Sequence, residues 1–337
     1  MSAARSPRRL PDRSLSRRGL LAAAGSAAFL ATSGCGLLGG SRAAGGNDHV
    51  EKAVIRVGTL PTTEYAPLAL AVRRGYFQHE GLQVEIVKAT DGSAALTSLI
   101  SGEYDVALSS YVPLLTAQSR GAADLRIVAD AGAAAPGTAV IMVPPDSPVR
   151  APADLAGRVV GVSAIGTVSD LLVKSALHEA GVPVDGVHPT PISFPNMPAA
   201  LAQRRLDAAL LTEPFITIAT REGSARTLVD AATGLADGLP LSGYGATARF
   251  VQDNPRTLAA FQRGLTRATL EARDRRAVEP LLPDIARISP EVAAETALVT
   301  FRAVPDGTQM QRVSDLMHRF AFIDEPLDAS TMIAASP

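Results

Sequence analysis

The chain has 337 residues, 47 % of them hydrophobic, so it is long enough for about two domains and can bury a sizeable core. Its formal net charge is −1, but residues 1–34 contain six arginines and one aspartate, a net charge of +5, which leaves −6 for the rest. A chain body with that balance lacks the basic surface that general nucleic-acid binding requires, so we expect no nucleic-acid partner.

Residues 1–34 are predicted to be a signal peptide. An arginine-rich start is followed by an apolar run over residues 19–32 and by small residues before Cys35. This run is shorter than the roughly 20 apolar residues that span a bilayer. Arg17 and Arg18 in "SRRGLL" resemble a twin-arginine export signal, and both this route and general secretion remain open.

Cys35 is the single cysteine of the chain, so it cannot form an internal disulfide. The preceding "TSGC" resembles a bacterial lipobox, although Thr32 replaces the usual leucine. We therefore predict lipidation at Cys35, a flexible tether over residues 35–52, and an exported protein anchored at the extracytoplasmic face of the cell membrane. The alternative is an ordinary cleaved secretory peptide beside an unmodified cysteine.

The remaining chain alternates β-branched runs with helical patterns, which is typical of an α/β protein. The predicted strands lie at residues 53–59, 82–89, 104–110, 125–130, 138–143, 158–164, 207–212 and 226–231. The helix after the first strand has Pro67 in its first turn, where its missing N–H costs nothing, and Gly75 at its end.

A weak internal repeat divides this region into two halves. Asp105 follows Gly58 by 47 positions, and Asp207 follows Gly161 by 46, each aspartate opening a second strand. Each half therefore consists of a strand, a polar junction and a helix, twice over. Two α/β lobes of one plan are the simplest interpretation.

Four polar junctions, at residues 61–65, 109–111, 164–169 and 212–215, follow predicted strands. Ligands of α/β sheets collect beyond such strand ends, where helix N-termini present unpaired N–H groups. The candidate ligand-binding residues are Thr62, Thr63, Glu64, Tyr65, Ser109, Ser110, Tyr111, Gly166, Thr167, Val168, Ser169, Glu213 and Phe215. The alternative is that these side chains only cap helices, as the capping-box spacing of Thr167 and Asp170 suggests.

Four stretches carry a family resemblance: "RVGTLPTTEYAPLALAVRRGYFQHEGLQVEIV", "SGEYDVALSSYVPLL", "DLAGRVVGVSAIGTVSDLLVKSALHEAGV" and "PNMPAALAQRRLDAALLTEPF". Over residues 53–325 the chain resembles solute-binding components of bacterial ABC importers, in the group for sulfonates, nitrate, taurine and thiamine-pyrimidine precursors. The resemblance implies a two-lobed type II periplasmic binding protein fold with a central cleft and two crossing segments. Lobe 1 would comprise residues 53–141 and 243–337, and lobe 2 residues 142–242, with hinges near 140–144 and 243–249.

The resemblance further implies a monomer that captures a small molecule, delivers it to an importer permease and needs no cofactor. One alternative is an enzyme of the same fold, in a pyrimidine-synthase branch that looks recognisable by a cysteine-rich motif and an iron site. The single cysteine of this chain argues against that alternative. A sensor domain is the third alternative. The five histidines are scattered without ligand spacing, so we expect no metal site.

The ligand's charge is the remaining question. Relatives suggest a sulfonate or nitrate, whereas the junctions contain Glu64, Glu213 and Asp170 and no lysine or arginine. Carboxylates oppose a bound anion, unless Arg249 turns into the cleft. We therefore expect a heteroaromatic such as a pyrimidine precursor, stacked on Tyr65, Tyr111 or Phe215 and accepted by Glu64 or Glu213.

Overall fold

The computed structural model describes residues 49–89 and 92–335. The predicted signal peptide, Cys35 and the tether up to residue 48 lie outside the described residues. Within the described part, no helix combines the length and apolar character needed to cross a membrane.

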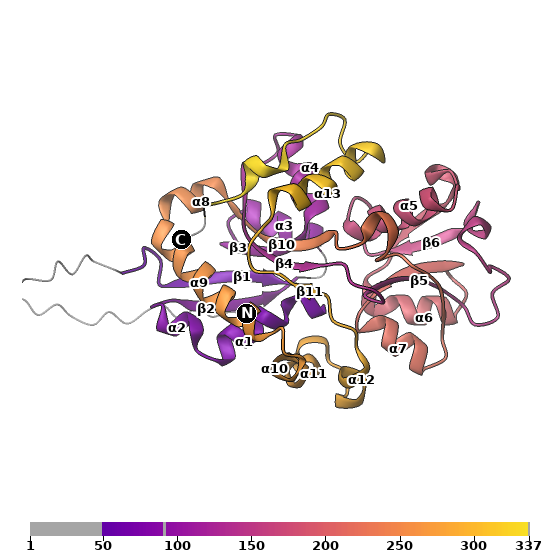
Figure 1. Cartoon of the computed structure of the whole chain (residues 1–337), viewed down its shortest axis with the longest axis horizontal. Coiled ribbons are helices and arrows are strands. Elements are labelled where there is room, and N and C mark those ends of the chain that lie inside the picture. Colours follow the sequence, from indigo (N-terminus) through magenta and orange to yellow (C-terminus); the bar gives the residue numbers. More distant parts are fainter. Residues whose placement is uncertain (1–48, 90–91, 336–337) are drawn as a thin grey trace, which may run out of the picture. The chain divides into compact units, whose positions relative to one another are not determined.

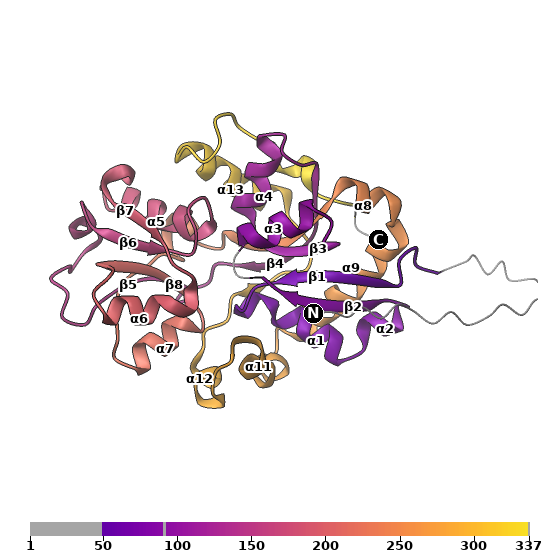
Figure 2. The same cartoon turned by 180° about the vertical axis from the view of Figure 1, so that it is seen from behind.

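The first sheet has six strands in the order β11-β4-β10-β3-β1-β2 (Figures 1 and 2). Their bounds are β1 Val54–Thr59, β2 Gln83–Lys88, β3 Val106–Ser110, β4 Leu125–Ala133, β10 Pro240–Thr247 and β11 Thr300–Phe301. β1 pairs in parallel with β2 and β3, whereas β10 lies antiparallel between β3 and β4, and β11 is antiparallel to β4. This sheet is thus built from chain segments on both sides of the second sheet.

The second sheet has five strands in the order β7-β6-β8-β5-β9. Their bounds are β5 Ala139–Val143, β6 Val159–Val162, β7 His188–Pro191, β8 Ala208–Thr212 and β9 Arg226–Asp230. The chain passes between the sheets at residues 134–138 and 231–239. The expected lobe boundaries, 141/142 and 242/243, fall inside β5 and β10, as do most of the expected hinge residues. β10 was not among the predicted strands.

Helices cover both faces of each sheet. Their bounds are α1 Ala66–Arg73, α2 Tyr76–His79, α3 Gly92–Ile100, α4 Tyr111–Ser119, α5 Val168–Glu179, α6 Met197–Ala202, α7 Phe215–Arg221, α8 Ala248–Asp253, α9 Pro255–Glu271, α10 Arg275–Val278, α11 Leu282–Ala286, α12 Pro290–Glu295 and α13 Gly307–Arg319. Figures 1 and 2 show α3, α4 and α13 on one face of the first sheet and α1 and α2 on the other. In the second sheet α5 lies opposite α6 and α7.

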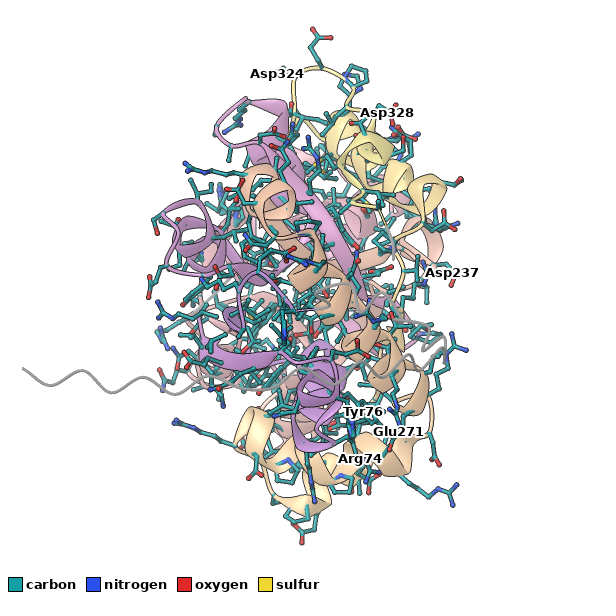
Figure 3. The ribbon with its side chains drawn as sticks, turned by 90° about the vertical axis from the view of Figure 1, so that its left-hand side faces the viewer. Arg74, Tyr76, Asp237, Glu271, Asp324 and Asp328 are labelled. Atoms are coloured by element: carbon teal, nitrogen blue, oxygen red, sulfur yellow. The ribbon has the colours of Figure 1, made fainter. Side chains whose placement is uncertain are left out.

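α1 forms as its sequence predicts. Pro67 occupies its first turn, and Gly75 follows its C-cap with φ 69°, the left-handed conformation that glycine adopts without penalty. A cluster at α9 then fixes this region: Arg74 Nε donates to Glu271 Oε1 at 2.9 Å, and the Tyr76 hydroxyl donates to the other carboxylate oxygen (Figure 3). Helices nearly 200 residues apart are thereby joined.

The internal repeat is confirmed in matching contacts. In the first sheet Asp105 Oδ2 accepts the Arg56 N–H at 2.9 Å, and in the second Asp207 Oδ2 accepts the Val159 N–H at 2.9 Å. Each aspartate therefore ties the strand it precedes to the start of the neighbouring parallel strand. The repeated glycines are equivalent too, since a Cβ at Gly58 would lie 2.3 Å from Tyr104 and one at Gly161 2.6 Å from Leu206.

Candidate functional site

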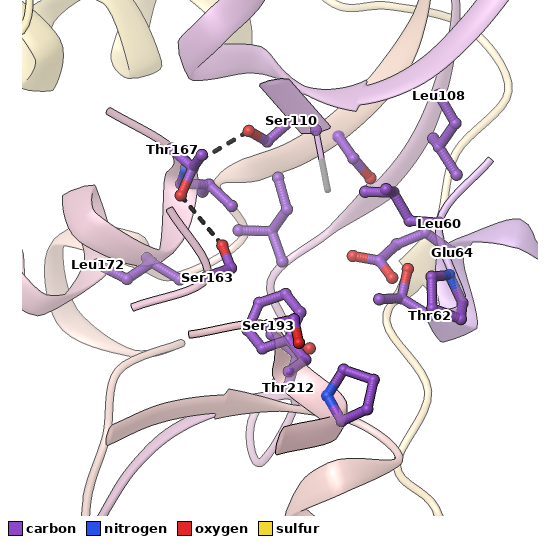
Figure 4. A pocket seen from close by; sticks show the side chains of 17 residues that line it. Leu60, Thr62, Glu64, Leu108, Ser110, Ser163, Thr167, Leu172, Ser193 and Thr212 are labelled. Atoms are coloured by element: carbon purple, nitrogen blue, oxygen red, sulfur yellow. Dashed lines mark hydrogen bonds between the residues drawn. The ribbon is translucent and has the colours of Figure 1, made fainter. Parts of the chain in front are cut away.

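One pocket is lined by residues from strands of both sheets, from the junctions after them and from the helices that follow. The described lining residues are Leu60, Pro61, Thr62, Glu64, Gly92, Leu108, Ser110, Ser163, Thr167, Val168, Leu172, Ser193, Phe194, Pro195, Thr212, Leu241 and Ser242. Figure 4 shows Glu64 and Thr62 on one side and Ser163, Thr167 and Leu172 on the opposite side. Five predicted site residues are in this group: Thr62, Glu64, Ser110, Thr167 and Val168.

Glu64 is the single ionisable side chain among the described lining residues. It lies in the short 3-10 turn Thr63–Tyr65 after β1 and packs over Gly132 of β4, where a Cβ would be 3.3 Å from Glu64 Cγ and 2.8 Å from Val299 Cγ2. A glycine at position 132 therefore gives the glutamate room. Burial raises the pKa of Glu64, and the Thr62 hydroxyl offsets only part of this effect.

A hydroxyl cluster forms the junction between β6 and α5. Thr167 Oγ1 donates to the Ala164 carbonyl at 2.7 Å and lies 3.2 Å from Ser163 Oγ, while Ser169 Oγ accepts the Ser163 N–H at 2.9 Å. The capping box considered as the alternative is absent, because the Thr167 hydroxyl donates to the Ala164 carbonyl and makes no cap bond. Asp170 accepts instead from the Gly166 N–H at 3.1 Å, and burial raises its pKa.

A direct hydrogen bond connects the two halves of the pocket. The Val168 N–H, at the start of α5, donates to Ser110 Oγ, at the end of β3, at 3.4 Å. Both residues line the pocket, so its walls from the first and second sheets meet at this point (Figure 4).

Other predicted site residues lie elsewhere. Ser109 Oγ donates to the Gly92 carbonyl at 3.1 Å, and Tyr111 is fully buried with its hydroxyl on Asp130 Oδ1 at 2.9 Å. Thr63 and Tyr65 are buried in the same turn as Glu64 but do not line the pocket. Gly166 precedes Thr167 and lines a separate surface groove. Ser169 is buried in the first turn of α5 and does not line the pocket.

Glu213 has a structural role, because its carboxylate is hydrogen-bonded to other described residues. Its carboxylate accepts the Thr217 N–H at 3.1 Å, the Thr217 hydroxyl at 2.9 Å and the Ala297 N–H at 3.1 Å. It is 4 % exposed and does not line the pocket. Burial raises its pKa, with those hydrogen bonds acting in the opposite direction. Glu213 therefore joins α7 to the segment after α12.

The aromatic ring of the pocket is Phe194, which the sequence did not single out. Phe194 stacks on the buried Phe215, with ring centroids 6.3 Å apart and an interplanar angle of 11°. The predicted Phe215 thus supports the aromatic wall from behind. Arg249 is no part of this site: on α8 its side chain is 91 % exposed beside Asp253.

Apart from Glu64, the polar side chains among the described lining residues are all serines and threonines. Those missed by the sequence reasoning are Ser163, Ser193, Thr212 and Ser242. The hydroxyls of Thr212 and Ser242 are buried without a hydrogen-bond partner among the described residues. Thr212 lies within a junction that the sequence had marked, and Ser163 directly precedes another. Ser193 follows β7 and Ser242 belongs to β10, two strands that the sequence had not predicted.

A family model described as NMT1/THI5 like matches residues 62–276. The chain belongs to this family. It is 28 % identical over 166 residues, 49 % of each chain, to the formylaminopyrimidine-binding protein of Halalkalibacterium halodurans. It is 34 % identical over 61 residues, 18 % of each chain, to the 4-amino-5-hydroxymethyl-2-methylpyrimidine phosphate synthase THI11 of Saccharomyces cerevisiae. The chain spans at most about half the length of these curated relatives.

The fold is that of the periplasmic binding proteins. The alkanesulfonate-binding protein SsuA from Xanthomonas axonopodis pv. citri, solved with MOPS bound, superposes with a TM-score of 0.73 over 84 % of this chain and 99 % of that one, at 24 % identity. The expected fold class is confirmed. The NMT1/THI5-like match contains every lining residue except Leu60 and Pro61. Among the described residues, no group of three or more His, Cys, Asp or Glu side chains could hold a metal ion.

Proposed function

We propose that the chain is the extracytoplasmic solute-binding component of an ABC importer, and that its ligand is a small N–H-bearing heteroaromatic such as an aminopyrimidine. The family, the fold and the name of the Halalkalibacterium relative support this assignment. The observation that supports this ligand class is that Glu64 is the one ionisable side chain among the described residues that line the pocket.

Glu64 suits an aminopyrimidine because a carboxyl group and an amidine-like edge form two parallel hydrogen bonds. One carboxyl oxygen accepts from the exocyclic amino group, and the other is paired with the ring nitrogen, with the proton on either partner. The raised pKa of Glu64 favours a retained proton that can be shared in this way. A bound sulfonate or nitrate would instead find no cationic side chain among the described lining residues, and it would be repelled by Glu64 whenever that group is ionised.

Phe194 is the second residue that favours a heteroaromatic ligand. It presents a ring held in place by Phe215, and apolar contacts from Leu108 and Leu172 complete a site for a flat ligand. We propose that the pyrimidine ring stacks on Phe194, in place of the residues that the sequence had suggested.

The test is isothermal calorimetry with 4-amino-5-hydroxymethyl-2-methylpyrimidine, formylaminopyrimidine, taurine, an alkanesulfonate and nitrate. We expect the pyrimidines to bind and Glu64→Leu, which removes both hydrogen bonds, to weaken them by about 100-fold or more. Glu64→Gln keeps an acceptor and a donor, so it should retain more affinity than Glu64→Leu, and it should lose any pH dependence of binding that the ionisation of Glu64 causes. Binding of a sulfonate but of neither pyrimidine would refute the proposed ligand class.

The synthase relative makes an enzyme the second candidate. Mass spectrometry of each bound pyrimidine after prolonged incubation with the protein separates the two functions. We expect the recovered ligand to be unchanged; a mass change that depends on the folded protein would favour the enzyme.

Membrane anchoring through Cys35 completes the proposed function. The lipobox-like "TSGC" supports it. In a bacterial expression host the full chain should partition into the membrane fraction and incorporate labelled palmitate, and Cys35→Ala should lose both properties. A full-length wild type that is exported without lipid label would contradict the anchor while leaving the binding function intact.

A further inference from the structure

Ser242 and Thr212 are the two described residues of the pocket lining whose buried hydroxyls have no hydrogen-bond partner, and Ser242 is the more buried of them. The residue is only 5 % exposed, it lines the pocket, and its Oγ has no hydrogen-bond partner among the described residues. A buried hydroxyl without a partner is unfavourable. A ligand group that bonds to it on binding removes this penalty.

The strand register places Ser242 beside the glutamate. Ser242 of β10 lies directly opposite Ser110 of β3 on one side and Gly132 of β4 on the other. Directly paired residues share a face and have Cβ atoms about 4.5–5.5 Å apart. Because Glu64 packs over Gly132, Ser242 lies between Glu64 and the Ser110–Val168 contact.

The backbone at Ser242 is irregular in a way that fits this role. The β10–β4 register shifts on both sides of Ser242, between Pro240 and Ser242 and again between Ser242 and Gly243. Such bulges change the direction of a side chain relative to a regular ladder and are frequent beside binding sites. Ser110 shows the contrast, because its hydroxyl already accepts the Val168 N–H.

We propose that Ser242 is a specificity-determining residue that hydrogen-bonds a polar substituent on the ligand ring, next to the edge held by Glu64. This inference rests on the proposed function and narrows it. The ligand is an aminopyrimidine with a hydroxyl or amide substituent, and the unsubstituted or methyl-substituted ring is the poorer ligand.

Two probes that differ by one oxygen test this. 4-Amino-5-hydroxymethyl-2-methylpyrimidine and 4-amino-2,5-dimethylpyrimidine are titrated into the wild type by calorimetry, and the ratio of their dissociation constants is compared. We expect the wild type to prefer the hydroxymethyl probe by about tenfold, the worth of one hydrogen bond to a buried hydroxyl. Ser242→Ala should reduce that preference to about one.

Two variants serve as controls. Ser110→Ala removes the opposite hydroxyl and its bond to Val168, so it should weaken both probes alike and leave their ratio unchanged. Tyr244→Phe removes another unpaired buried hydroxyl of β10, one outside the pocket lining, and should leave the ratio of the two dissociation constants unchanged. Circular dichroism and melting curves confirm that each variant is folded.

The outcomes separate this inference from the proposed function. A wild type that binds both probes equally, or a preference that persists in a folded Ser242→Ala variant, overturns the role of Ser242 but keeps the aminopyrimidine class. A wild type that binds neither probe overturns the proposed ligand, and the role of Ser242 with it.

Discussion

At the scale of single residues, the site depends on which carboxylates face the pocket and which serve the fold. Glu64 and Glu213 both follow strands and both have a pKa raised by burial. Only Glu64 lines the pocket, whereas Glu213 has three protein donors. Two residues that are alike in sequence context therefore have different roles, because Thr217 and Ala297 provide hydrogen-bond donors to Glu213, whereas Glu64 lines the pocket.

Glu213→Gln should lower stability without changing ligand choice. An amide keeps one acceptor oxygen but turns an NH₂ group toward a backbone N–H, so one favourable bond is lost and two donors face each other. We expect the free energy of unfolding to fall by about 1–2 kcal/mol in urea titrations. Glu222→Gln, exposed at the end of α7, is the control and should have little effect. A large loss of pyrimidine affinity in a stable Glu213→Gln protein would contradict this prediction and show that Glu213 takes part in ligand binding.

Asp130 is a buried carboxyl outside the pocket whose charge should affect stability. Burial raises its pKa from 3.8 to about 7, although bonds from Tyr111 and the Ala131 N–H and the nearby Arg302 act in the opposite direction. The Asp306 carboxylate adds to the increase. The folded protein therefore holds this proton more tightly than the unfolded chain does, so Asp130 lowers stability as the pH rises from about 3.8 to about 7.

Asp130→Asn should remove this pH dependence. The asparagine keeps an acceptor for Tyr111 and carries no charge at any pH, so the variant should gain stability relative to wild type as the pH rises. The gain at pH 8 is at most about 4 kcal/mol, from 1.36 kcal/mol per unit of pKa shift. Urea titrations at pH 5, 6, 7 and 8 measure it, with Asp146→Asn, an exposed aspartate, as the control. Parallel stability curves for wild type and Asp130→Asn would show that Asp130 is ionised across this range.

At the scale of elements, β-branched runs predicted eight strands, and all eight are present within three residues. The central strand β10 was missed because "PLSGYGAT" is rich in glycine, serine and proline, which are depleted in strands. Its glycines are required by packing instead: a Cβ at Gly245 would lie 2.8 Å from Leu114 of α4. Strand β7, "HPTP", lies at a sheet edge, where prolines are tolerated.

The same limits apply to the site. Strand ends predicted the polar junctions, and five of the expected residues line the pocket. Sequence could not decide between Ser109 and Ser110, because neighbouring residues point to opposite faces and the strand's register was unknown. Ser242 and Phe194 were missed because Ser242 lies in β10 and Phe194 follows β7, and the composition of these two segments did not predict strands.

Gly243→Ala tests the packing of β10 against α4. A Cβ there would lie 2.5 Å from Tyr111 Oη and 3.0 Å from the Ala129 carbonyl oxygen, so helix or strand must move. We expect a loss of about 1–3 kcal/mol in the free energy of unfolding, measured by urea denaturation. Gly186→Ala is the matched control, since the nearest atom to its Cβ would be 3.9 Å away. Equal stability of the two variants would mean that β10 tolerates side chains and that its glycines have another cause.

At the scale of the whole molecule, ligand binding and motion should be coupled, because the pocket takes residues from strands and junctions of both sheets. The segments 134–138 and 231–239 join those sheets, so a rotation there would separate Glu64 from Thr167 and break the Ser110–Val168 bond. A third connection joins them through Arg221 and Glu295 at 2.6 Å and through Glu213 and Ala297.

We predict that a ligand bridging both walls shifts the protein toward a more closed arrangement, since it gains its full set of contacts only there. Small-angle scattering on the protein beginning at residue 49 should show a smaller radius of gyration with saturating hydroxymethyl pyrimidine than without it. Glu64→Leu, which removes one wall's contact, should keep the larger radius at the same ligand concentration. If the radius is unchanged while calorimetry shows saturation, the site binds its ligand in one fixed arrangement, and the joining segments are rigid supports rather than hinges.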